Sequence, residues 1–297
     1  MASNRFLELL NSGKKIALDG ATGTNLQRRG LTPGTPSDAW VMDNPEGVLR
    51  LYRDFVEAGS DIILTNTFGS SRVNLNRSGR VDHFEETNRR AVALAKQAVE
   101  GTDTLVAGSM GPLGEMLQPY GTLGEQEAET AYAEQAKVLA ESGVDLLVIE
   151  TQFDINEAKA AVRGAKSVTD LPIVVSFSYD RGTRSMMGVK PAQVGKELSD
   201  LGVAAIGINC GRSLEDNLKA LSELREATGL PVWFKPNAGL PHNDFEGKLV
   251  YDVTPEMMGA QVEQWFAAGA QLMGGCCGTS PEHLKAIAQA VHAHNGN

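Results

Sequence analysis

The sequence predicts an α/β protein built as a single (β/α)8 barrel, often called a TIM barrel. Three observations support this fold. Eight short apolar runs alternate with longer segments of helical spacing, the length of 297 residues suits one such barrel, and chemically distinctive residues recur where the apolar runs end. With 42% hydrophobic residues the chain can bury a large core.

The apolar runs are the candidate strands because each is short, rich in branched residues and followed by a polar or glycine-containing segment. In chain order they span residues 16–18, 61–65, 105–109, 146–149, 173–177, 205–208, 232–235 and 271–273. Continuous apolar character fits strands that are buried on both faces, as in a parallel barrel.

The segments between the runs show helical periodicity. Residues 124–142 place six apolar or amide side chains on one face, which predicts a helix covering a sheet. Two later helices have clear start signals, a cap residue followed by proline at the first helical position. These signals are Thr254-Pro255-Glu256 and Ser280-Pro281-Glu282.

Nothing in the composition divides the chain, so we expect one domain over residues 1–297. Long connections at 29–45, 69–80 and 111–121 each follow a predicted strand and belong to the carboxyl-terminal face. The net charge of -10 argues against nucleic acid or an anionic membrane as the main partner. We find no targeting or membrane-spanning segment and expect a cytoplasmic protein with reduced thiols.

The three cysteines carry the chemistry. Cys276 and Cys277 are adjacent and flanked by glycines, and Cys210 follows another predicted strand. Small buried residues or a strained disulfide between neighbours are the alternatives. Because strand ends of a barrel meet at one mouth, the topology brings the three thiols together there. Three thiolates leave tetrahedral zinc one open position, which predicts a catalytic zinc site.

Such a site favours sulfur chemistry. A zinc with three thiolates is a weak Lewis acid toward water but binds a further thiol as thiolate, a nucleophile at neutral pH. A thiol amino acid also needs partners for its ammonium and carboxylate. Asp19 and Glu150 at strand ends suit the ammonium, and backbone N–H groups in the turn at 19–24 suit the carboxylate.

Seven segments of the chain resemble the homocysteine S-methyltransferase family, over about residues 15 to 290. They are Leu18-Asp19-Gly20-Ala21-Thr22-Gly23-Thr24, Thr65-Asn66-Thr67-Phe68, Ala107-Gly108-Ser109-Met110-Gly111-Pro112, Ile149-Glu150-Thr151, Asn209-Cys210, Pro236-Asn237-Ala238-Gly239 and Gly274-Gly275-Cys276-Cys277-Gly278. This family includes betaine-homocysteine and S-methylmethionine-homocysteine methyltransferases and the homocysteine module of cobalamin-dependent methionine synthase.

The resemblance implies a role for each matching residue. It makes Cys210, Cys276 and Cys277 the zinc ligands, and it directs Asp19 and Glu150 toward the homocysteine amino group. Gly20 and Thr22 would lie near the carboxylate, and Asn209 is expected to contact substrate beside Cys210. The implied reaction is attack of the L-homocysteine sulfur on a donor methyl group, giving methionine.

The methyl donor is less determined by the residues. Betaine or S-methylmethionine is favoured, and aromatic faces recognise such onium groups. The candidates are Trp40, Phe68 and Tyr120, although each also suits packing. The vertebrate betaine enzymes have tyrosine after the glutamate, whereas Glu150-Thr151 resembles the methionine synthase module and some stand-alone bacterial enzymes. A separate methyl-corrinoid protein is therefore an alternative donor.

Two other classes of protein stay open. Lys235 ends a predicted strand and suits a Schiff-base barrel aldolase, or else a solvated charge or a substrate contact at the rim. A zinc-holding binding module without turnover would need no second pocket. Selenocysteine or another thiol remains an alternative acceptor, and a homo-oligomer is compatible with outer barrel helices.

Overall fold

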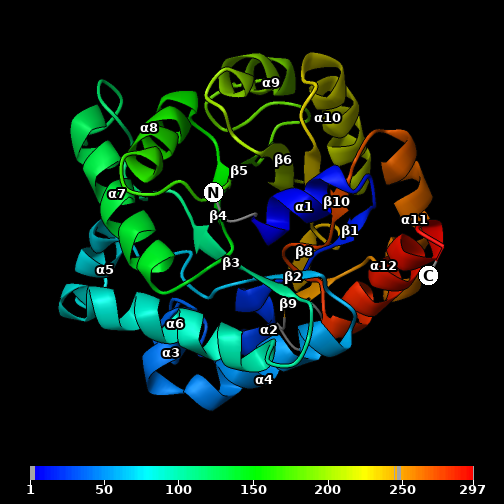
Figure 1. The fold of residues 1–297 in the computed structure, drawn as a ribbon, viewed down its shortest axis with the longest axis horizontal. Coiled ribbons are helices and arrows are strands. Elements are labelled where there is room, and N and C mark those ends of the chain that lie inside the picture. The colour runs from blue at the N-terminus through cyan, green and yellow to red at the C-terminus, as the bar shows by residue number, and fades with distance from the viewer. Residues whose placement is uncertain (1–3, 244, 246–248, 297) are drawn as a thin grey trace.

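The computed structural model describes residues 4–243, 245 and 249–296. These residues form an eight-stranded parallel sheet in the order β1-β10-β7-β6-β5-β4-β3-β2. A parallel bridge between Leu18 and Ile62 joins the two ends of this order, β1 and β2, so the sheet closes on itself. Helices surround this ring of strands (Figure 1). The predicted (β/α)8 barrel is confirmed.

All eight predicted strands are present. They are β1 (Ile16–Ala17), β2 (Ile62–Leu64), β3 (Leu105–Met110), β4 (Leu146–Gln152), β5 (Ile173–Phe177), β6 (Ala205–Cys210), β7 (Val232–Pro236) and β10 (Leu272–Met273). Strands β4 and β6 continue further than predicted, so Glu150 and Cys210 lie inside strands. In β4 the register shifts between Ile149 and Gln152, which keeps the strand paired with β5 beyond its apolar run.

The helices cover the outside and the two ends of the barrel. They are α1 (Arg5–Asn11), α2 (Thr22–Arg28), α3 (Ala39–Asp43), α4 (Pro45–Glu57), α5 (Arg72–Arg77), the short 3-10 helix η1 (Val81–His83), α6 (Phe84–Ala98), α7 (Glu125–Glu141), α8 (Ile155–Lys166), α9 (Pro191–Ser199), α10 (Leu214–Ala227), α11 (Pro255–Ala267) and α12 (Pro281–His294). The face predicted for 124–142 is buried in α7. Helices α11 and α12 begin at the predicted prolines, and Thr254 accepts a hydrogen bond from the Met257 N–H.

The amino-terminal end of the barrel is closed by α1, which the sequence analysis did not single out. Phe6 and Leu10 pack into the cluster of inward-facing strand residues, and α1 lies across the centre of the ring in Figure 1. The Asn4 amide donates to the Asp145 carbonyl at 3.1 Å, and the Gln271 amide donates to the Leu10 carbonyl at 2.8 Å. The opposite, carboxyl-terminal end is therefore the one left for a site.

Three connections shape that carboxyl-terminal end. Two of the predicted long connections contain the short helices α3 and α5. A third element, not predicted, is an antiparallel hairpin of β8 (Pro241–Asn243) and β9 (Leu249–Tyr251) between β7 and α11. Within the described part of the chain, no helix is long and apolar enough to cross a membrane.

Candidate metal centre and substrate cavity

The structure brings the three cysteines together. Cys210 is the last residue of β6, and Cys276 with Cys277 lies in the loop after β10. Their Sγ atoms all lie within 4.8 Å of one another, and those of Cys210 and Cys276 are 3.0 Å apart. All three are free thiols, so the disulfide alternative does not describe this structure. Sulfur ligands at this mutual distance suit one soft ion such as zinc.

The glycines before the cysteine pair are needed for close packing. A Cβ added at Gly274 would lie 2.6 Å from the Asp19 carbonyl oxygen, and one at Gly275 would lie 2.3 Å from the Thr279 side chain. Neither has a positive φ, unlike Gly278 at +84°. Gly278, after the pair, therefore supplies the positive φ of this loop, whereas Gly274 and Gly275 allow close approach to Asp19 and Thr279.

The electrostatics of the thiols also favour a cation. Hydrogen bonds from Cys210 and Cys276 hold the pKa of Cys277 well below its usual range. Its thiol partners and burial raise the pKa of Cys210. A bound cation would relieve the repulsion between thiolates, because like charges this close oppose each other. Asn237, whose N–H donates to the Cys210 carbonyl at 3.2 Å, has a buried Oδ1 without a partner. These features fit a bound metal ion.

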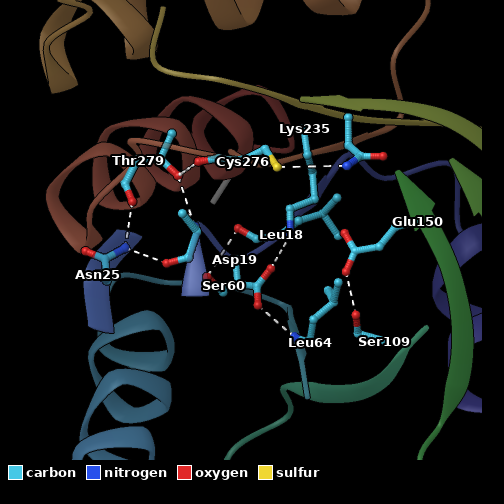
Figure 2. A network of polar contacts seen from close by, with 12 residues as sticks. Leu18, Asp19, Asn25, Ser60, Leu64, Ser109, Glu150, Lys235, Cys276 and Thr279 are labelled. Carbon is cyan, nitrogen blue, oxygen red and sulfur yellow. Dashed lines mark hydrogen bonds and ion pairs between the residues drawn. The ribbon is translucent and has the colours of Figure 1, made fainter. Parts of the chain in front are cut away.

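Three buried charged groups lie beside the thiols (Figure 2). The Lys235 ammonium forms an ion pair with Asp19, and their side chains are 3% and 0% exposed. The second Asp19 oxygen accepts the Leu64 N–H at 2.7 Å. Burial alone lowers the pKa of Lys235, but Asp19 and Glu150 together raise it above its usual value. Lys235 is therefore a protonated internal counterion, and the expectation of a solvated lysine at the rim is wrong.

Glu150 has a different environment from Asp19. The Ser109 hydroxyl donates to its Oε1 at 2.5 Å, and the side chain faces the cavity at the mouth. Burial raises the pKa of Glu150 to about 7, and the Lys235 charge opposes this shift only in part. Glu150 is consequently the cavity carboxylate that has room for an ammonium group.

A cavity of about 410 Å³ opens at the mouth of the barrel. Its lining includes the three cysteines, Gly20, Thr22, Phe68, Thr151, Glu150 and Lys235. Most predicted site residues are thus brought together. Asp19 and Asn209 are fully buried and do not line the cavity. The substrate contacts of these two residues therefore remain predictions.

Only one of the three predicted aromatic residues reaches this cavity. Phe68 lines it, and its ring lies where a Cβ at Gly111 would come within 2.6 Å. Trp40 lies on α3 and packs against the core and Gly47. Tyr120 is 74% exposed on the loop after β3. The structure therefore does not bring Trp40 and Tyr120 to the cavity, because both lie in connections whose paths the sequence does not specify.

Sequence reasoning underestimated two residues. Lys235 follows the inward-facing Trp233 by two positions, and the two-residue repeat of a strand would have placed its side chain inside the barrel. Tyr251, on the unpredicted hairpin, packs against Gly278, where a Cβ would lie 2.3 Å from its ring. Burial and the neighbouring Cys277 raise the pKa of Tyr251 to about 12. No local sequence pattern indicated that contact.

A cysteine cluster that could hold a metal ion, beside a buried carboxylate at the mouth of a (β/α)8 barrel, places the protein in the class of barrel proteins whose site lies at the strand ends. Comparison with known proteins identifies the family. The family model for homocysteine S-methyltransferase matches residues 16–291. The chain belongs to the homocysteine S-methyltransferase family.

Individual relatives agree with this assignment. The chain is 30% identical to methionine synthase of Mycobacterium leprae and 29% identical to that of Mycobacterium tuberculosis, over 92% of its length. It spans only about a quarter of these relatives, 24% of each. The metallated homocysteine methyltransferase MmuM from Escherichia coli superposes with a TM-score of 0.81 at 26% identity, covering 95% of this chain and 99% of that one. These findings support a methyltransferase enzyme.

Proposed function

We propose that this protein transfers a methyl group to the sulfur of L-homocysteine, giving methionine, with Zn²⁺ held by Cys210, Cys276 and Cys277. The observation that carries the proposal is the thiol cluster within 4.8 Å at the wall of the cavity. Zinc bound there supplies a Lewis acid that lowers the pKa of a thiol substrate, so that its sulfur is nucleophilic at neutral pH. We further propose one domain over residues 1–297, acting in the cytoplasm.

The chain's own residues orient the substrate. Glu150 accepts the ammonium group, and the backbone around Gly20 and Thr22 receives the carboxylate. Helix α2 begins at Thr22 without a side-chain cap, which leaves backbone N–H groups of its first turn for such a partner. Lys235 balances the charge of Asp19, so Glu150 is the carboxylate that remains to pair with the substrate ammonium. Fixing both ends of the amino acid holds its sulfur at the cysteine cluster.

Homocysteine binding is expected to weaken below about pH 7, because protonated Glu150 cannot pair with an ammonium group. The dissociation constant should rise toward about tenfold for each pH unit below the pKa. Glu150→Gln should bind more weakly at pH 8 and lack this component of the pH dependence. Calorimetric titrations of zinc-loaded protein from pH 6 to 8, with zinc content checked at each pH, measure both. If the dissociation constants of the two proteins changed equally with pH, Glu150 would not be the partner of the ammonium group.

For the donor, we propose betaine or S-methylmethionine, with Phe68 as the aromatic contact. Phe68 lines the cavity and is 39% exposed, so its ring is accessible to an onium group. A methyl-corrinoid protein is the second candidate. It is favoured by the likeness to methionine synthases, of which the chain matches 24%.

The deciding experiment is methionine formation by mass spectrometry, with betaine, S-methylmethionine or methylcobalamin offered separately. Turnover with an onium donor supports the first proposal. Turnover with methylcobalamin alone supports the corrinoid alternative. Failure of all three with intact homocysteine binding would exclude these donors.

Phe68→Leu should raise KM for an onium donor by about 2- to 30-fold, the range expected for one cation–π contact. Tyr120→Leu is the matched control, because Tyr120 is exposed and lies outside the cavity. The KM for homocysteine should stay close to wild type in both variants. An unchanged donor KM in Phe68→Leu would exclude the aromatic contact.

A further inference from the structure

Two residues at the site have unusual backbone conformations. Among the described residues, Thr151 and Cys210 are the only non-glycine residues with a positive φ, at +60° and +59°. Residues with a Cβ atom are disfavoured in this left-handed region, so the surrounding structure must hold the backbone in that conformation. Thr151 directly follows Glu150, and Cys210 is one of the three clustered cysteines. The two strained positions therefore help to fix the orientation of the Glu150 carboxylate and of the proposed metal ligand Cys210.

One side chain connects these two positions. The Asn209 Oδ1 accepts the Thr151 N–H at 2.9 Å, and the Asn209 Nδ2 donates to the Thr151 hydroxyl at 2.7 Å. The Ser176 hydroxyl also donates to Oδ1, at 2.7 Å. Ser176 lies on β5, between β4 and β6 in the sheet. The Asn209 amide therefore bridges three neighbouring strands and has a fixed orientation.

The same amide group faces the thiols. Asn209 Nδ2 lies 3.5 Å from the Cys210 Sγ and 3.9 Å from the Cys276 Sγ, within reach of N–H···S hydrogen bonds. Asn209 is 0% exposed and does not line the cavity. A direct contact with homocysteine, as the sequence suggested, would require the side chain to leave all of these partners.

We propose that Asn209 is a positioning residue of the metal centre, which holds the strained backbone at Thr151 and Cys210 and shares its remaining N–H between two metal-binding sulfurs. This proposal rests on the proposed zinc site. Donated hydrogen bonds stabilise thiolate sulfur and fix its direction toward a bound ion. An asparagine is required because one end of the amide must accept and the other must donate. Aspartate would instead place a negative charge beside the thiolates.

The test is metal binding, which needs neither homocysteine nor donor. Asn209→Ala should weaken zinc affinity by about 10- to 100-fold, the range typical of groups that orient metal ligands. It should also shift the sulfur-to-cobalt charge-transfer band of the Co²⁺-substituted protein. Asn88→Ala is the matched control. Asn88 is also buried and hydrogen bonded, to the Ser70 and Phe84 carbonyls, but lies outside the centre. It should keep zinc affinity within about twofold of wild type.

A second pair of variants covers the case in which Asn209→Ala does not fold. Thr151→Ala removes the hydroxyl that orients Asn209 and should weaken zinc binding several-fold, whereas Thr151→Ser retains the hydroxyl and should bind like wild type. Wild-type affinity and an unchanged cobalt spectrum in Asn209→Ala, or equal affinities for Thr151→Ala and Thr151→Ser, would overturn the role of Asn209. If the wild-type protein itself binds no zinc, the proposed function fails at the metal.

Discussion

Replacing Cys276 by alanine is expected to abolish zinc retention and methyl transfer together while the barrel stays folded. The variant leaves two of three thiol ligands, too few to retain zinc against a chelator. The loop itself does not depend on the side chain. The Cys276 N–H donates to the Pro236 carbonyl at 2.9 Å, and the Cys276 carbonyl accepts the Thr279 hydroxyl at 2.7 Å.

Zinc content, thermal unfolding and methionine formation measure this prediction on the same preparations. Zinc should fall from about one ion per chain to near zero, and turnover should fall to background. Cys276→Ser is a useful companion, because it preserves the size of the side chain but not its affinity for zinc. Full activity in metal-free Cys276→Ala protein would refute the proposed zinc dependence.

Lys235→Met is expected to destabilise the fold by about 3 to 5 kcal/mol, the cost of leaving a buried charge without its partner. The ion pair with Asp19 is almost completely buried, and Glu150 adds a second carboxyl group nearby. Removing the ammonium forces the Asp19 carboxyl to take up a proton or to remain charged in a low-dielectric interior. Urea unfolding monitored by circular dichroism measures the loss of stability.

Two comparisons give this result its meaning. The double variant Lys235→Met/Asp19→Asn removes both charges and should recover much of the lost stability. Lys159→Met removes the lysine of a partly exposed ion pair with Glu197 and should change stability by only about 0 to 1 kcal/mol. A Lys235→Met protein as stable as Lys159→Met would show that the buried pair contributes little.

The ion pair also bears on the aldolase alternative. A Schiff-base lysine must present a free amine to its substrate. In this structure the carboxylates of Asp19 and Glu150 raise the pKa of Lys235 and hold the ammonium in place. Family membership favours methyl transfer as well. We therefore expect no borohydride-trapped imine with Lys235.

The sequence by itself determined the fold and the grouping of the three cysteines. The alternation of apolar runs and amphipathic segments predicts the barrel, because strands buried on both faces and helices buried on one leave different periodicities. The barrel topology then places the carboxyl end of every strand at one mouth. This is why Cys210, Cys276 and Cys277 could be assigned to one centre without coordinates.

Only the tertiary structure decided what each polar residue at that mouth does. Asp19 and Glu150 are both strand-end carboxylates in the sequence. In the structure Asp19 forms an ion pair with Lys235, whereas Glu150 faces the cavity. Asn209 bridges two strained backbone positions in neighbouring parts of the sheet, and Trp40 packs away from the cavity. Such roles depend on contacts between residues far apart in the chain. Local periodicity shows which face a side chain occupies but not which partner it meets there.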